Sequence, residues 1–86
     1  MKMMAELSLY PLREPDLALP IHDFIAALRS VAGIEMQIGP TSTVISGEAD
    51  AVFDAVRAAY LTATATGQRV LVVKYINENP AAEMRL

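Results

Sequence analysis

The turn at Gly39-Pro40 is the feature that most constrains this chain, because it joins two short segments that both have the pattern of a strand. Apolar and polar residues alternate from Ile34 to Ile38, and the β-branched pair Val44-Ile45 lies within the segment from Thr43 to Ser46. Glycine tolerates unusual backbone angles and proline fixes its own φ near about −65°, so together they favour a tight reversal. Two strands joined in this way form an antiparallel hairpin.

A helical pattern lies on each side of this hairpin. Pro20 suits a first helical position, and after it apolar residues recur at steps of three and four. The same spacing returns from about Glu48 to Thr64, and Gly33 and Gly67 follow the two stripes as helix ends. The first stripe is Ile21, Phe24, Ile25, Leu28 and Val31; the second is Val52, Phe53, Val56, Ala59, Tyr60 and Ala63.

One further strand is expected at each end of the chain. Residues alternate from Ala5 to Tyr10 before Pro11, a loop follows from Leu12 to Leu19, and the last strand runs from Val70 to Asn77. Asn79-Pro80 ends that strand, and the tail at 81–86 is expected to fray. The order β-α-β-β-α-β predicts an α+β, ferredoxin-like sandwich, with a four-stranded antiparallel sheet and both helices on one face. We expect residues 1–86 to form this single domain.

Composition narrows the class of protein. Hydrophobic residues make up 53% of the 86 residues, which excludes global disorder and suggests that some apolar surface faces a partner subunit. A net charge of −3 argues against nucleic-acid binding. No apolar run is long enough for membrane insertion, and the first residues do not resemble a signal peptide. With no cysteine and no implied cofactor, we expect a cytoplasmic protein.

Topology suggests where a site would form. We expect the first and third strands to lie side by side and parallel, with the other two strands opposite to them. One end of the sheet would then gather polar side chains that are distant in sequence: Glu6, Thr41, Ser42, Thr43, Lys74 and Asn77. A few polar groups among apolar walls are typical of small-molecule sites. The alternative is that the hydroxyl groups only bond to the backbone of their own turn.

The last strand is apolar on both faces. Val70, Val72 and Ile76 share one face with Lys74, and Leu71, Val73 and Tyr75 occupy the other, but the helices can cover only one of the two faces. Burial against a second chain would resolve this conflict, so we predict a homo-oligomer, a dimer or tetramer, packed through the sheets. Lys74 either pairs with Glu6 on the first strand or extends into solvent.

Signatures of catalysis are lacking. His22 is the only histidine, and it stands beside Asp23 at the start of a helix, where a surface position is the usual outcome. Glu48, Asp50 and Asp54 read as a solvated helix face. We therefore predict a binding protein and not an enzyme.

Three blocks of the chain, Ala5–Leu12, Gly39–Glu48 and Val72–Pro80, resemble the YkoF-like family of thiamine-binding proteins. The resemblance implies a ferredoxin-like fold, assembly through β-sheets, and binding of thiamine or its hydroxymethylpyrimidine part in salvage, transport or homeostasis. By position in these blocks, the candidate ligand contacts are Glu6, Ser8, Thr41, Ser42, Thr43 and Asn77. YkoF carries two such repeats and this chain has one, so pairing of separate chains would replace the internal pairing.

The chemistry of these side chains suits such a ligand. Hydroxyl, amide and carboxylate groups read the ring nitrogens and amino group of an aminopyrimidine, and Tyr10 or Tyr75 could contact a thiazolium cation. Two alternatives remain. A regulatory oligomerisation module of the ACT type would bind another small metabolite, and a small dimeric ferredoxin-like enzyme would use His22 as its base.

Overall fold

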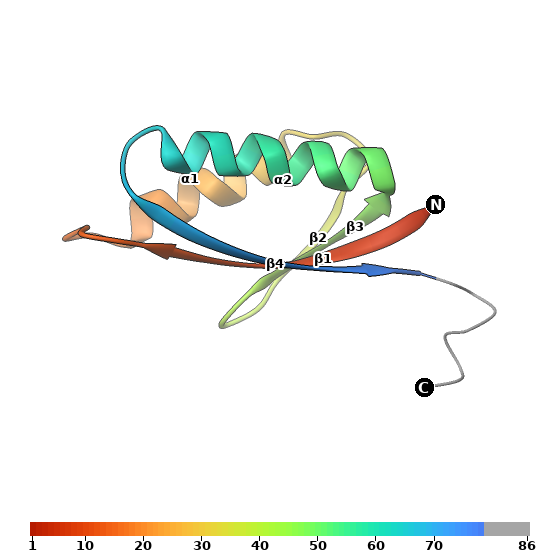
Figure 1. Ribbon diagram of the computed structural model, residues 1–86, viewed down its shortest axis with the longest axis horizontal. Helices are drawn as coiled ribbons and strands as arrows, with labels where there is room; N and C mark the ends of the chain where they lie inside the picture. The colour runs from red at the N-terminus through yellow and green to blue at the C-terminus, as the bar shows by residue number, and fades with distance from the viewer. Residues whose placement is uncertain (79–86) are drawn as a thin grey trace.

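The computed structural model describes residues 1–78, which form one four-stranded sheet and two helices. The strand order is β2-β3-β1-β4, and every neighbouring pair is antiparallel. Both helices cover the same face of the sheet (Figure 1), so the predicted ferredoxin-like α+β fold is confirmed. The elements are β1 (Lys2–Pro11), α1 (Ala18–Arg29), β2 (Glu35–Ile38), β3 (Thr43–Glu48), α2 (Ala49–Thr64) and β4 (Arg69–Asn77). The expected strand end at Asn79-Pro80 and the tail at 81–86 lie outside the described residues.

The predicted parallel pairing of the first and third strands is wrong. β1 and β3 are antiparallel, with Leu7 opposite Thr43 and Lys2 opposite Glu48. Each helical crossover returns the chain to a strand parallel to the one it left, so β2 runs with β1. The hairpin reverses the direction, and β3 must then oppose β1. The beginning of β3 therefore lies beside the middle of β1 and not beside its beginning.

Several element boundaries differ from the prediction, and the largest shift at a strand is in β1, which begins at Lys2, three residues before Ala5. Helix α1 begins at Ala18, two residues before Pro20. Pro20 still lies in the first turn, where backbone N–H groups have no partner within the helix, so its missing N–H costs no hydrogen bond. Strand β3 continues through Gly47 to Glu48, beyond the predicted segment that ended at Ser46. Gly47 is required there by space, because a Cβ atom would lie 2.5 Å from the carbonyl oxygen of Gly33.

The core lies between the helix-facing side of the sheet and the two helices. Apolar residues of β1, β3 and both helices form it: Met3, Ala5, Leu7, Phe24, Leu28, Ile45, Val52, Ala55, Val56, Ala59 and Ala63. Phe53 and Tyr60 were predicted in the stripe of α2 but are 49% and 45% exposed, while Ala55, outside that stripe, is completely buried. Phe53 lies at the flank of the helix and packs on Tyr75 of β4, with ring centroids 5.0 Å apart.

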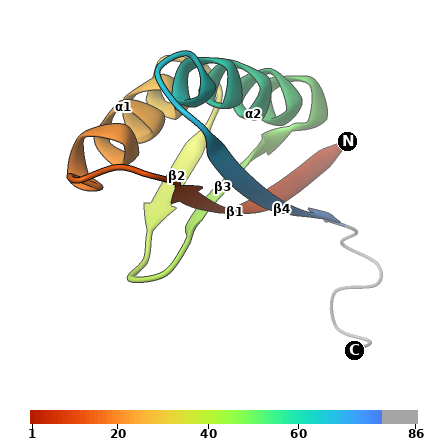
Figure 2. The same ribbon diagram turned by 60° about the vertical axis from the view of Figure 1, so that its left-hand side comes forward.

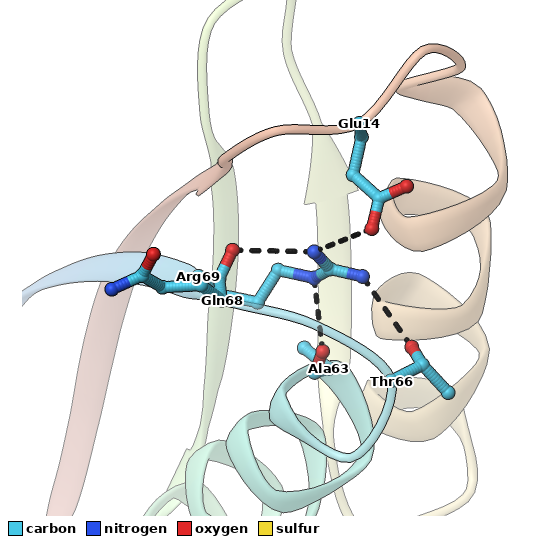
Figure 3. Close-up of polar contacts among 5 residues, drawn as sticks. All are labelled: Glu14, Ala63, Thr66, Gln68 and Arg69. Carbon is cyan, nitrogen blue, oxygen red and sulfur yellow. Dashed lines mark hydrogen bonds and ion pairs between the residues drawn. The ribbon is translucent and has the colours of Figure 1, made fainter.

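The end of α2 and the loop before α1 are joined by a buried arginine (Figure 3). The side chain of Arg69 is 1% exposed, and its Nη1 lies 2.8 Å from Oε1 of Glu14. Its Nε donates to the carbonyl oxygen of Ala63 at 3.0 Å. Nη1 and Nη2 donate to the carbonyl oxygen of Gln68 and the hydroxyl of Thr66, so every guanidinium nitrogen has a partner.

The face of the sheet away from the helices is partly apolar and open, as the pattern of the last strand predicts. Val70, Val72 and Ile76 of β4 are 45%, 44% and 57% exposed. They lie on an edge strand, because β4 pairs only with β1 in the part of the chain that the structure describes. None of the helices within residues 1–78 combines the length and the apolar character needed to cross a membrane.

Candidate ligand-binding site

A cavity of about 140 Å³ lies between α1 and the end of the sheet where β1 continues beyond the start of β3. The β2–β3 turn and the β1–α1 loop lie toward this same end of the molecule (Figures 1 and 2). Apolar walls come from β1 and α1, through Leu7, Leu9, Ile21, Phe24 and Ile25. The polar wall is the turn with its three hydroxyl residues, together with Ser8.

Strand alternation divides the three hydroxyl residues between two faces. Thr43 shares its face with Leu7 and is 7% exposed on the helix side, where it lines the cavity. Within residues 1–78 its hydroxyl has no hydrogen-bond partner, and no fully buried side-chain oxygen there lacks one. The hydroxyl of Thr43 therefore remains accessible from the cavity.

The hydroxyl groups of Ser8 and Ser42 are engaged within the protein. Ser42 donates to Oε2 of Glu6 at 3.2 Å, and Ser8 donates to the carbonyl oxygen of Thr41 at 3.4 Å. These bonds attach the β2–β3 turn to β1. The alternative, in which hydroxyl groups bond only to the backbone of their own turn, describes neither bond, because both bonds join segments that are distant in sequence.

Of the two alternatives for Lys74, the structure shows the pair with Glu6. The two residues are opposite each other in the β1–β4 register, and Nζ of Lys74 lies 3.5 Å from Oε1 of Glu6. The lysine side chain is 76% exposed, so the pair contributes at most about 1 kcal/mol. Glu6 does not line the cavity. Its carboxylate instead accepts the hydrogen bond from Ser42 on the open face of the sheet, and so helps to hold the β2–β3 turn against β1.

Asn77 does not belong to this group. It lies opposite Met3 on β1, toward the end of the sheet where β3 finishes at Glu48. The prediction that it converges with the hydroxyl residues is wrong, because that prediction depended on parallel β1 and β3. Glu6, Ser8, Thr41, Ser42 and Thr43 do come together.

His22 lies on the surface, as predicted. Its side chain is 81% exposed, and Nδ1 lies 3.7 Å from Oδ1 of Asp23. Neither residue lines the cavity beside Thr43. The histidine that the enzyme alternative would use as its base is therefore not part of this cavity.

Sequence reasoning missed the main chain of Leu9. The N–H of Leu12 donates to the carbonyl oxygen of Gln68, and the N–H of Glu78 donates to the carbonyl oxygen of Lys2. Both bonds join β1 to β4 through even-numbered residues of β1, so the even-numbered residues of β1 direct their N–H and carbonyl groups toward β4. Odd-numbered residues face β3, and the register would place Leu9 opposite Thr41. Strand β3 begins only at Thr43, and no backbone bond joins Leu9 to the turn within residues 1–78. No sequence signal could show this, because it depends on where the pairing stops.

Fold and cavity together define a small ferredoxin-like protein with a ligand-sized hollow at one end of its sheet. The chain belongs to the thiamine-binding protein family, whose model matches residues 5–86. The resemblance seen in the sequence is thereby confirmed. A comparison with curated proteins gives no match.

Solved structures share the fold over nearly the whole chain. A protein from Streptococcus pneumoniae is 24% identical, with 98% of this chain and 94% of that chain covered and a TM-score of 0.85. A candidate thiamine biosynthesis/salvage protein from Thermotoga maritima is 20% identical, with 94% and 87% covered and a TM-score of 0.78. At these identities the likeness shows the fold alone.

Proposed function

We propose that the protein binds thiamine or its hydroxymethylpyrimidine part in the cavity at the β2–β3 turn, without catalysing a reaction. One observation carries this proposal: in a member of the thiamine-binding family, Thr43 is more than nine-tenths buried yet keeps its hydroxyl free toward an apolar hollow. A molecule that fills the hollow would cover this hydroxyl, and covering it without a hydrogen bond would be costly, so the site favours a ligand with a polar group there. Thr41, Ser42 and Ser8 complete the polar wall, and Glu6 orients Ser42.

The size of the cavity supports binding of one ring. Apolar cavities of about 150 Å³ hold a single benzene ring, and this cavity measures about 140 Å³. Phe24, Ile21 and Ile25 of α1 supply apolar contacts for the faces of a pyrimidine. The thiazolium of intact thiamine would extend out of the hollow, where a protein of net charge −3 attracts a cation.

We propose that residues 1–86 form one domain that acts as a homo-oligomer through its sheets, in thiamine salvage, transport or homeostasis in the cytoplasm. The apolar strip formed by Val70, Val72 and Ile76 supports assembly, because such a strip on an edge strand favours contact with another chain. A second copy on the open face would also cover Glu6 and Ser42. The Thermotoga relative, described as a thiamine biosynthesis/salvage candidate, supports the pathway.

Isothermal titration calorimetry with thiamine and with hydroxymethylpyrimidine tests the proposal. We expect saturable heat with at least one of the two ligands. The absence of heat with both at millimolar concentration would refute the proposal. Thermal stabilisation by amino acids alone would instead favour the module of the ACT type.

A further inference from the structure

We infer that the main chain of Leu9 recognises the edge of an aminopyrimidine, so that the protein selects the amino form of the ring over its oxo form. This inference rests on the proposed function and adds to it a rule of specificity. Leu9 lines the cavity and lies where β1 extends beyond the start of β3, so that no residue of β3 pairs with it.

The geometry of an antiparallel strand places a donor beside an acceptor at this position. Leu7, two residues earlier, faces Thr43, and Leu9 would face Thr41 in the same register. Because the N–H and the carbonyl group of one residue point to the same side of an extended strand, Leu9 directs both away from β4 and toward the β2–β3 turn, whose residues line the cavity. The carbonyl oxygen of Thr41 accepts the hydroxyl of Ser8 at 3.4 Å instead of an amide of β1.

An aminopyrimidine has the complementary edge. A ring nitrogen that accepts a hydrogen bond stands next to an exocyclic amino group that donates one. The ring nitrogen would accept from the N–H of Leu9, and the amino group would donate to its carbonyl oxygen. The ligand would thus continue the sheet by one step in the place that β3 leaves open, with its ring against Phe24 and Ile21. Thr43 then remains available for another polar group of the ring.

Replacing the amino group by an oxo group reverses this edge. The oxo form presents an acceptor toward the carbonyl oxygen of Leu9 and a ring N–H toward its N–H. An acceptor then faces an acceptor and a donor faces a donor, so neither hydrogen bond forms. Sites that hydrogen-bond a ligand reject analogues that cannot make those bonds. We expect a loss of affinity of about 10- to 100-fold for the oxo form.

Calorimetry with hydroxymethylpyrimidine and with its oxo analogue tests this selectivity, and hydrogen exchange of backbone amides tests its origin. We expect the amino form to bind at least about tenfold more tightly, and the Leu9 amide to exchange about tenfold more slowly when it is bound. The amide of Leu7, which faces Thr43 in β3, is the internal control and should not change. Thr43→Val should weaken both ligands alike and leave their ratio unchanged.

Equal affinity for the two forms, or unchanged exchange at Leu9 in the presence of bound ligand, would overturn this inference while the proposed function stands. No binding of hydroxymethylpyrimidine or thiamine would overturn both.

Discussion

Arg69 and Glu14 form an ion pair across the end of the molecule, with Nη1 and Oε1 2.8 Å apart and the arginine side chain 1% exposed. The pair ties the turn after α2 to the loop that leads into α1. Helix α1 supplies Ile21 and Phe24 to the cavity, so this contact anchors the loop that leads into one wall of the cavity. An arginine near the start of a strand does not reveal such a role in the sequence.

Loss of the carboxylate should destabilise the fold. In Glu14→Gln the guanidinium keeps its bonds to Ala63, Gln68 and Thr66 but loses its counter-charge. Glu14 is 24% exposed, so solvent screens part of the effect, and we expect a decrease of about 1–3 kcal/mol in the free energy of unfolding. Urea denaturation measures this change. The control Asp54→Asn removes an exposed carboxylate of α2 and should alter stability by less than about 0.5 kcal/mol; equal effects of the two variants would contradict the prediction.

Thr43→Val should weaken ligand binding without weakening the fold. The substitution keeps the branched shape but removes the hydroxyl that faces the cavity. One net hydrogen bond corresponds to an affinity loss of about 2- to 10-fold, measured by calorimetry. The melting temperature should not fall, because no protein group among residues 1–78 bonds to this hydroxyl. Ser46→Ala, on the open face of the same strand, should bind normally; a matching loss there would show that the effect is not local to the cavity.

Charge on the open face should prevent assembly. Val72 is 44% exposed on β4, opposite Ser8 of β1, and Val72→Asp would place a carboxylate within the apolar strip that we propose to be an interface. We expect association to weaken by about tenfold or more, seen by sedimentation as a shift toward the single-chain mass. Leu61→Asp on α2, which is also half-exposed, is the matched control and should still assemble. A wild-type protein that sediments as a single chain would refute the interface.

Tyr75 should make stability depend on alkaline pH. Burial raises the pKa of its phenol above the ordinary value, because the packed environment beside Phe53 disfavours the charged form. The folded state therefore holds this proton more tightly than the unfolded state does. That advantage is complete below about pH 10 and is lost as the pH rises through the folded pKa. Urea unfolding between pH 8 and 11 should show a steeper loss for wild type than for Tyr75→Phe, and parallel curves would contradict this assignment.

Local patterns predicted most of the fold correctly, for reasons visible in single residues. The alternation around Leu7 and the spacing of Phe24 and Leu28 reflect side chains that must leave water, and the structure buries all three. The Gly39-Pro40 turn gave the hairpin, since few other residues allow so tight a reversal. Phe53 was misassigned to the core because periodicity gives the direction of a stripe only within a few tens of degrees.

The candidate site was predicted only in part. Glu6 and Ser42 lie within hydrogen-bond distance as the pattern suggested, and Lys74 pairs with Glu6. Asn77 was misplaced because the direction of β1 relative to β3 depends on crossovers, which no local pattern records. The network around Arg69 was not foreseen either, since its partners are distant in the chain.

The sequence by itself determined which segments become strands and helices, where the chain reverses, and which family the chain resembles, because these depend on residue type and spacing over short distances. Only the tertiary structure decided where the pairing of β1 with β3 stops and which face each hydroxyl occupies. Within residues 1–78, that register leaves the main chain of Leu9 without a partner on the β3 side and Thr43 facing a hollow. It is fixed by the packing of α1 and α2 on the sheet as a whole, and no single segment contains it.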